Sequence, residues 1–171
     1  MPRLLVALSL GTLALAAVPA AARAQIGLAP QVSYGDDYDF AVGGRLALRL
    51  PTETALEITG SFDLFFPEAD NLDYWEVNAN VNYLVTMVES LFVPYVGAGL
   101  NVARLDGHVR PVENGFGGGE FSETEYGANL LVGVRYVGAA AVPFAEARFE
   151  VDGGDQVVFT AGVLFTIGPG P

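Results

Sequence analysis

Arginine and carboxylate side chains recur in this sequence within segments that are otherwise rich in apolar residues. An arginine can give two parallel hydrogen bonds to one carboxylate, and a charge that is removed from water needs such a partner. Four arginines and five acids make up the set, a near balance that favours mutual pairing. We therefore predict a structural network of ion pairs, formed by Arg45, Arg49, Glu57, Asp63, Glu76, Arg135, Glu146, Arg148 and Glu150.

His108 is the single histidine of the chain and the residue best suited to act as a general base. Acyl transfer by this route needs a nucleophile and a carboxylate beside the histidine. Ser122 and several acids lie near it in the sequence, but the stretch also contains the glycine-rich residues 115–119. Such a stretch is a poor platform for a preorganised site. We predict that His108 is a solvated loop residue and that the chain has no catalytic site.

Many acids gather between the apolar segments, where carboxylate oxygens could bind a hard cation such as Ca²⁺. Glu68, Asp70 and Asp73 are the candidate ligands in the densest of these stretches. No complete calcium-loop signature is present, so we expect solvated surface charge there and no bound metal. No cofactor is expected either, because the Gly-x-Gly at 97–99 lacks the strand-to-helix setting of a nucleotide-binding motif.

The elements that would position these side chains show a period of two. In each of eight segments, one set of alternate residues is apolar and uncharged, while the other set is mostly small or polar. Successive side chains of a β-strand point to opposite faces, so the pattern predicts strands with one dry face and one polar face. The segments are 26–34, 40–50, 56–66, 75–85, 92–102, 126–136, 145–151 and 157–167. The large apolar exceptions on the polar face are Phe65, Leu84, Leu131, Phe144 and Leu164.

The connections between these segments alternate in length. Those at 51–54, 86–90 and 138–141 are short. Those at 36–39, 67–73, 105–123 and 152–155 form a second set, in which the stretch 105–123 is the longest. In an up-and-down meander the second set falls at one end of the sheet. Short turns at one end and longer loops at the other are typical of outer-membrane barrels.

The length of the predicted strands, and the hydrocarbon that would surround them in a bilayer, together favour a closed membrane barrel. Strands of about ten residues, tilted by about 45°, cross a bilayer. An open sheet edge in hydrocarbon leaves backbone groups unpaired, so the first and last strands must pair. Eight strands leave an interior just wide enough for side chains to fill. The sequence therefore predicts an all-β fold: an eight-stranded antiparallel up-and-down transmembrane β-barrel with a filled lumen.

The first residues resemble a secretory signal. Arg3 precedes the apolar run 4–18, Pro19 ends that run, and Ala22-Arg23-Ala24 offers small residues before a cleavage point. We expect residues 1–24 to be a cleaved signal peptide and residues 25–171 to form the barrel domain. The chain has a net charge of −12 and no cysteine. Such acidity argues against nucleic acid as a partner, and disulfides cannot hold the exported fold.

Three segments carry a resemblance to a known family. They are Pro94-Tyr95-Val96-Gly97-Ala98-Gly99-Leu100, Gly133-Val134-Arg135-Tyr136 and Pro143-Phe144-Ala145-Glu146-Ala147-Arg148-Phe149. Across the chain from residue 25 on, the sequence resembles the small eight-stranded outer-membrane β-barrels that include the OmpA membrane domain and OmpX. The resemblance implies a place in the cell outer membrane, and we expect a monomer. Its partners would be outer-membrane lipids, periplasmic chaperones and the barrel-insertion machinery.

Three functional hypotheses follow from this reading. The first is a non-enzymatic outer-membrane barrel that acts in membrane integrity, or in surface interaction through acidic extracellular loops. The second is a lipid A-modifying barrel enzyme, for which His108 would be needed. The third is a soluble exported carrier of lipocalin type, in which the apolar face lines a ligand cavity, because alternation alone does not say which face is inside.

Overall fold

The computed structural model describes residues 25–49, 55–68, 72–85, 87, 89–109, 119–151 and 156–167. The predicted signal peptide, residues 1–24, lies outside these ranges. Within them, no helix is long and apolar enough to cross a membrane. The strands are β1 (Gln25–Gly35), β2 (Asp39–Arg49), β3 (Leu56–Phe66), β4 (Leu72–Leu84), β5 (Phe92–Val109), β6 (Gly119–Tyr136), β7 (Ala141–Val151) and β8 (Val157–Ile167).

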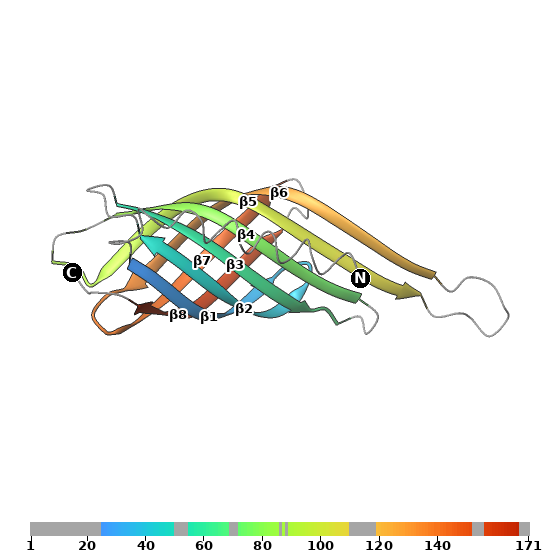
Figure 1. The fold of residues 1–171 in the computed structure, drawn as a ribbon, viewed down its shortest axis with the longest axis horizontal. Helices are drawn as coiled ribbons and strands as arrows, with labels where there is room; N and C mark the ends of the chain where they lie inside the picture. The colour runs from blue at the N-terminus through green and yellow to red at the C-terminus, as the bar shows by residue number, and fades with distance from the viewer. Residues whose placement is uncertain are drawn as a thin grey trace.

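Every strand pairs with its sequence neighbours in antiparallel fashion, and β8 returns to β1 to close the barrel (Figure 1). The closing register joins Ile26 to Ile167 and Val32 to Ala161. Closure leaves no open edge along the barrel wall, which satisfies the backbone groups without water. The predicted closed eight-stranded antiparallel barrel is confirmed.

Two ends of the barrel are distinguished below. The loop end carries the β1–β2, β3–β4, β5–β6 and β7–β8 connections. The turn end carries the other three connections. The start of β1 at Gln25 and the end of β8 at Ile167 also lie there. In barrels of this shape the longer connections face the outside of the cell.

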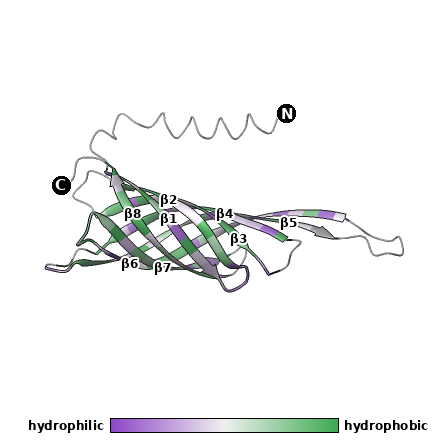
Figure 2. Ribbon diagram, turned by 90° about the horizontal axis from the view of Figure 1, so that it is seen from below, coloured by the Kyte–Doolittle hydropathy of each residue, from purple (hydrophilic) through white to green (hydrophobic). Residues whose placement is uncertain are grey.

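The barrel wall is polar inside and apolar outside. Burial alternates along each strand, so that β4 buries Glu76, Asn78, Asn80 and Asn82 while Val77 and Val81 are exposed. Figure 2 shows apolar residues along the wall and more hydrophilic ones where β5 and β6 extend past it. A soluble protein has the opposite distribution, with apolar residues inside and polar residues outside. The third hypothesis, a lipocalin-type carrier, required the apolar face inside and is wrong on this point.

The large apolar exceptions on the polar face fill the lumen. They are buried in three clusters with other inward-facing residues, because charged pairs alone cannot occupy all the space between the strands. Phe65 packs at the loop end, Leu84 and Leu131 pack with Tyr95, and Phe144 packs with Leu164. The lumen is therefore a packed core with a polar composition.

The predicted loop 105–123 is wrong at both of its ends. β5 continues to Val109 and β6 begins at Gly119, with Leu105 opposite Glu123 and His108 opposite Glu120. This hairpin extends beyond the rest of the barrel (Figure 1). Composition favoured a loop, but β4 also pairs with β5 as far as Gly107, so neighbouring strands support the extension. The remaining loop residues, 110–118, lie outside the described ranges.

The turn between β4 and β5 holds Glu89 at a φ of 63°. A side chain with a branched Cβ is strained in this left-handed region, whereas glycine adopts it freely. We expect Glu89→Val to lower the free energy of unfolding by about 1–2 kcal/mol. Glu89→Gly should leave it unchanged or slightly higher. Urea unfolding in lipid vesicles, followed by the fluorescence of Trp75, measures both. Equal losses for the two variants would show that the turn relaxes out of this conformation.

Candidate functional site

The centre of the lumen is occupied by an arginine that is held on two sides. Arg45 gives two hydrogen bonds of 2.7 Å to the Glu146 carboxylate, from β2 across to β7. Its Nε donates to Gln31 Oε1 at 3.0 Å, and its guanidinium lies 4.6 Å from the centre of the Phe144 ring. The Tyr95 hydroxyl also donates to Glu146, at 3.0 Å. The two residues of the pair and their two hydrogen-bond partners, Gln31 and Tyr95, thus come from four different strands.

Nearer the turn end, Arg135 of β6 forms a second bidentate pair. Its two terminal nitrogens donate to the Glu57 carboxylate at 2.8 and 2.6 Å. The guanidinium lies 5.0 Å from the centre of the Tyr95 ring, within the range of a cation–π contact. Tyr95 has room because Gly133 lies opposite it, where an added Cβ would overlap the ring. The glycine of the Gly-Val-Arg-Tyr segment therefore makes space for the aromatic ring that connects the two pairs.

Nearer the loop end, Arg148 of β7 contacts two carboxylates. Its Nε donates to Glu150 at 2.6 Å and its terminal nitrogen to Glu76 at 2.8 Å. All three side chains are fully shielded from solvent. The Gln156 amide donates to both acids, at 2.6 and 2.9 Å, and the Tyr74 hydroxyl donates to Glu76 at 2.7 Å.

Asp63 is buried and has no arginine partner among the described residues. Its carboxylate accepts hydrogen bonds from Gln31 Nε2 at 2.8 and 3.0 Å and from the Ser33 hydroxyl at 3.1 Å. The Ser33 hydroxyl also lies 2.9 Å from that of Thr160, so β1, β3 and β8 meet here. Since Gln31 also accepts from Arg45, the Asp63 cluster is joined to the central ion pair through one side chain.

Acids outnumber arginines in the described lumen. Its buried arginines are Arg45, Arg135 and Arg148, and its buried acids are Glu57, Asp63, Glu76, Glu146 and Glu150. Each of these arginines donates to at least one carboxylate, and amides and hydroxyls donate to the remaining acid oxygens. Arg135 Nε and Arg148 Nη1 are buried without a hydrogen-bond partner in the described structure. An arrangement of this kind stabilises by mutual hydrogen bonding, and it fills the cross-section of the barrel with side chains that hold one another in place.

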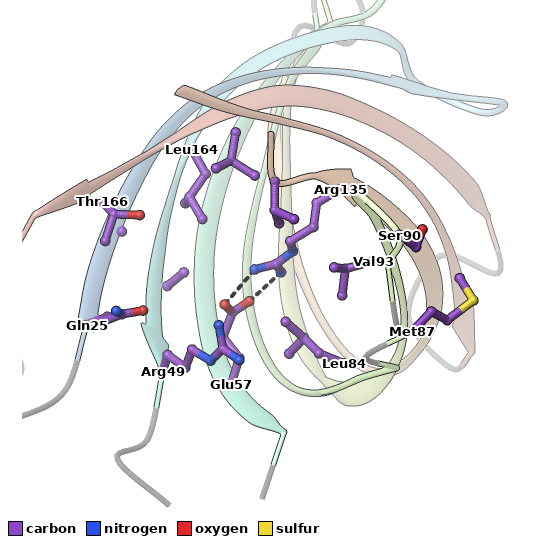
Figure 3. Close-up of a pocket in the computed structure, with 14 residues that line it drawn as sticks. Gln25, Arg49, Glu57, Leu84, Met87, Ser90, Val93, Arg135, Leu164 and Thr166 are labelled. Carbon is purple, nitrogen blue, oxygen red and sulfur yellow. Dashed lines mark hydrogen bonds and ion pairs between the residues drawn. The ribbon is translucent and has the colours of Figure 1, made fainter. Parts of the chain in front are cut away.

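Arg49 is the predicted network member that the structure places elsewhere. It lies at the end of β2, is exposed, and makes no ion pair with any residue of the described ranges. Its side chain faces a cavity of about 290 Å³ at the turn end (Figure 3). The expectation of pairing is corrected here because this position reaches the mouth of the barrel, where water can solvate the charge.

The other candidate residues lie at the loop end, away from the lumen network. The backbone of His108 is in β5 beyond the barrel wall, and its side chain is outside the described part of the structure. Glu68 and Asp73 are exposed, and Asp70 lies outside the described ranges. Within those ranges, no group of three or more histidine, cysteine or acidic residues could hold a metal.

Three polar residues of the lumen network were missed in the sequence. Tyr74 and Tyr95 were not assigned to the polar face, although each falls on it by alternation, two residues before Glu76 and Gly97 respectively. Gln156 precedes β8 and was placed in no segment, yet it is almost fully buried. Strict alternation would have found the two tyrosines. The Gln156 amide reaches Glu76 and Glu150 only because the folded chain turns back into the lumen before β8.

A tyrosine pair closes the loop end of the lumen. Tyr38, in the β1–β2 turn, stacks on Tyr74 with ring centres 3.7 Å apart and an angle of 11° between the planes. Burial raises the pKa of the Tyr38 phenol, and the negative charge of Glu125 adds to the effect. The Tyr38 hydroxyl therefore stays neutral beside Tyr74, whose own hydroxyl donates to Glu76.

Comparison with known proteins identifies the fold. No protein-family model and no curated protein matches the sequence. The N-terminal β-barrel domain of Pseudomonas aeruginosa OprF superimposes with a TM-score of 0.61 at 16% identity, covering 84% of this chain and 97% of that one. Neisserial surface protein A gives 0.56 at 17% identity, with 84% and 96% covered. Ail, the attachment invasion locus protein of Yersinia pestis, gives 0.51 at 18%, with 83% and 96% covered.

The chain has the fold of the small outer-membrane β-barrels. An outer-membrane barrel must present apolar side chains to lipid around its whole circumference. Here the outward residues are apolar, and Leu100 and Leu130 near the middle of their strands are 68% and 58% exposed. Exposed aromatic rings lie toward the strand ends, at the depth of the lipid headgroups. They include Tyr34, Phe40 and Phe66 at the loop end and Tyr83, Phe92 and Phe165 at the turn end. The outer membrane is where this barrel resides.

Proposed function

We propose that this chain is a non-enzymatic outer-membrane barrel that contributes to membrane integrity or to contacts at the cell surface. Its lumen would be a structural plug, and its acidic loop end would make the contacts. The proposal includes a monomer, surrounded by outer-membrane lipids and delivered by periplasmic chaperones to the barrel-insertion machinery. The observation that carries it is the division of charge between an interior with buried ion pairs and a loop end at which the described acids outnumber the described arginine.

The loop end is strongly acidic. Arg104 is the arginine described there, and its Nε lies 2.9 Å from Asp106. The acids described at this end are Asp36, Asp37, Asp39, Glu68, Asp73, Asp106, Glu120, Glu123 and Glu125. Such a surface attracts cationic partners and repels anionic ones over about one Debye length, roughly 8–10 Å. The names of two similar structures, a surface protein and an attachment protein, agree with a role at the cell surface.

The test compares adhesion and permeability in cells that carry the barrel. Glu123→Gln with Glu125→Gln should reduce binding of the cells to cationic beads, and the reduction should disappear at high salt. Glu89→Gln, at the turn end, is the matched control and should have no effect. Loss of adhesion supports surface contact. A permeability defect on deletion of the whole barrel, with unchanged adhesion in the variant, supports membrane integrity instead.

The enzymatic hypothesis has its own measurement. His108→Ala should leave the acylation pattern of lipid A unchanged when the lipid is analysed by mass spectrometry. A pattern that depends on the barrel and is altered by this substitution would overturn the proposal, because acyl transfer would then need the histidine as a base.

A further inference from the structure

The cavity at the turn end is a site that the structural plug does not explain. It encloses about 290 Å³, at the lower edge of the volumes of small-molecule sites. Residues from all eight strands line it, and the Glu57–Arg135 pair lies at its side toward the barrel centre. A cavity of this size could hold about ten water molecules. It therefore has room for a ligand of roughly ten non-hydrogen atoms.

The charged part of the lining has an excess of positive charge. Glu57 is engaged by both terminal nitrogens of Arg135, which leaves the Arg49 guanidinium without a carboxylate in the described structure. Figure 3 shows the side chains of Arg49 and Arg135 directed toward the same region as the Glu57 carboxylate. An arginine of this kind presents a planar set of donors that fits a carboxylate. Among its described residues, the lining thus offers one cationic group, Arg49, that is not engaged by a carboxylate and can receive an anion.

The remaining lining is largely apolar. Leu84, Val93, Val142 and Leu164 line the cavity from β4, β5, β7 and β8, and Met87 lies in the turn between β4 and β5. Figure 3 places Leu84, Val93 and Met87 across the cavity from Gln25 and Arg49. A cavity that only needed to hold water would gain nothing from such a wall. Apolar surface opposite a free arginine matches a ligand with an anionic head and a hydrocarbon chain.

We propose that the turn-end cavity binds a small amphiphilic anion, a carboxylate with a short alkyl chain, with its head at Arg49 and its chain against Leu84, Val93 and Met87. Octanoate, with ten non-hydrogen atoms, is the probe of matching size. In an outer-membrane barrel the turn end faces the periplasm, so the ligand enters from that side. This site lies at the opposite end of the barrel from the acidic loops. The proposal of ligand binding there does not depend on the function proposed for those loops.

Methionine NMR gives a direct test. The chain has two methionines, Met1 and Met87, so a barrel labelled at the methionine methyl carbon carries a reporter in the cavity wall. The signal is assigned with Met87→Leu. Octanoate, titrated below its micelle concentration into the barrel in a nonionic detergent, should shift the Met87 signal to saturation. Arg49→Gln adds no second methionine and should weaken that binding at least tenfold, because it removes a charge-assisted hydrogen bond.

Three controls make the result decisive. Arg104→Gln removes an arginine at the opposite end and should leave octanoate affinity unchanged. Val142→Phe should fill the cavity and reduce binding while Arg49 remains. Octanamide and acetate should bind at least tenfold more weakly than octanoate, since each lacks one half of the ligand. The proposal is overturned if octanoate does not saturate the Met87 shift, if Arg49→Gln binds as tightly as the parent, or if acetate binds as tightly as octanoate.

Discussion

Arg148→Met is expected to lower the free energy of unfolding by about 3–5 kcal/mol, because it leaves buried carboxylates without their cation. Glu76 and Glu150 both accept hydrogen bonds from this arginine, and all three side chains are fully shielded from solvent. Methionine keeps much of the length of the side chain, so the loss reports charge and hydrogen bonding more than volume. Urea unfolding in lipid vesicles, followed by Trp75 fluorescence, gives the value.

The matched control is Arg104→Met in the β5–β6 hairpin. Arg104 also pairs with an acid, Asp106, but the pair lies in contact with water and the substitution should leave the unfolding midpoint unchanged. Adding Glu76→Gln and Glu150→Gln to Arg148→Met should recover part of the lost stability, because the uncompensated charges are then removed. If Arg148→Met and Arg104→Met have equal effects, the lumen is open to water and the description of a packed plug is wrong.

Leu130→Arg is expected to lower the free energy of unfolding from the bilayer by about 2–4 kcal/mol, because it places a charge at the middle of the lipid-facing surface. Leu130 points outward from β6, between the exposed Tyr126 toward the loop end and Tyr136 toward the turn end. An arginine at this depth reaches the headgroups only by bending along the barrel wall or by thinning the bilayer. The same vesicle measurement detects the change.

Thr124→Arg is the control for that substitution. Thr124 lies on the same strand, points to the same outward side as Leu130, and is exposed where β6 extends past the wall. An arginine there meets water, and its repulsion by Arg104, which lies opposite it on β5, is screened, so the loss of stability should be well below that at Leu130. Equal effects at the two positions would show that no hydrocarbon surrounds Leu130. That result would contradict the conclusion that the barrel lies in a membrane, even though the fold is a closed barrel.

The strands and their faces could be predicted from the sequence because a β-strand has only two sides. Once residues alternate between charged and apolar, as in Glu146-Ala147-Arg148-Phe149-Glu150, the period of two assigns each side chain to a face. Hydrocarbon then requires closure, and the number of segments sets a lumen that side chains must fill. Eight strands, the inward direction of Arg45, Glu57 and Glu146, and the location in the outer membrane all follow from local pattern and solvent.

Apart from the Arg148–Glu150 contact within β7, the pairing of charges was decided by the tertiary structure. Arg45 meets Glu146 and Arg135 meets Glu57, although 101 and 78 residues separate them in sequence. Which acid an arginine reaches depends on the stagger and tilt of strands around the closed barrel, and neither quantity is encoded in the alternation of one strand. Arg49 alternates in phase with Arg45 but is the last residue of β2, so it lies at the mouth of the barrel beside a cavity.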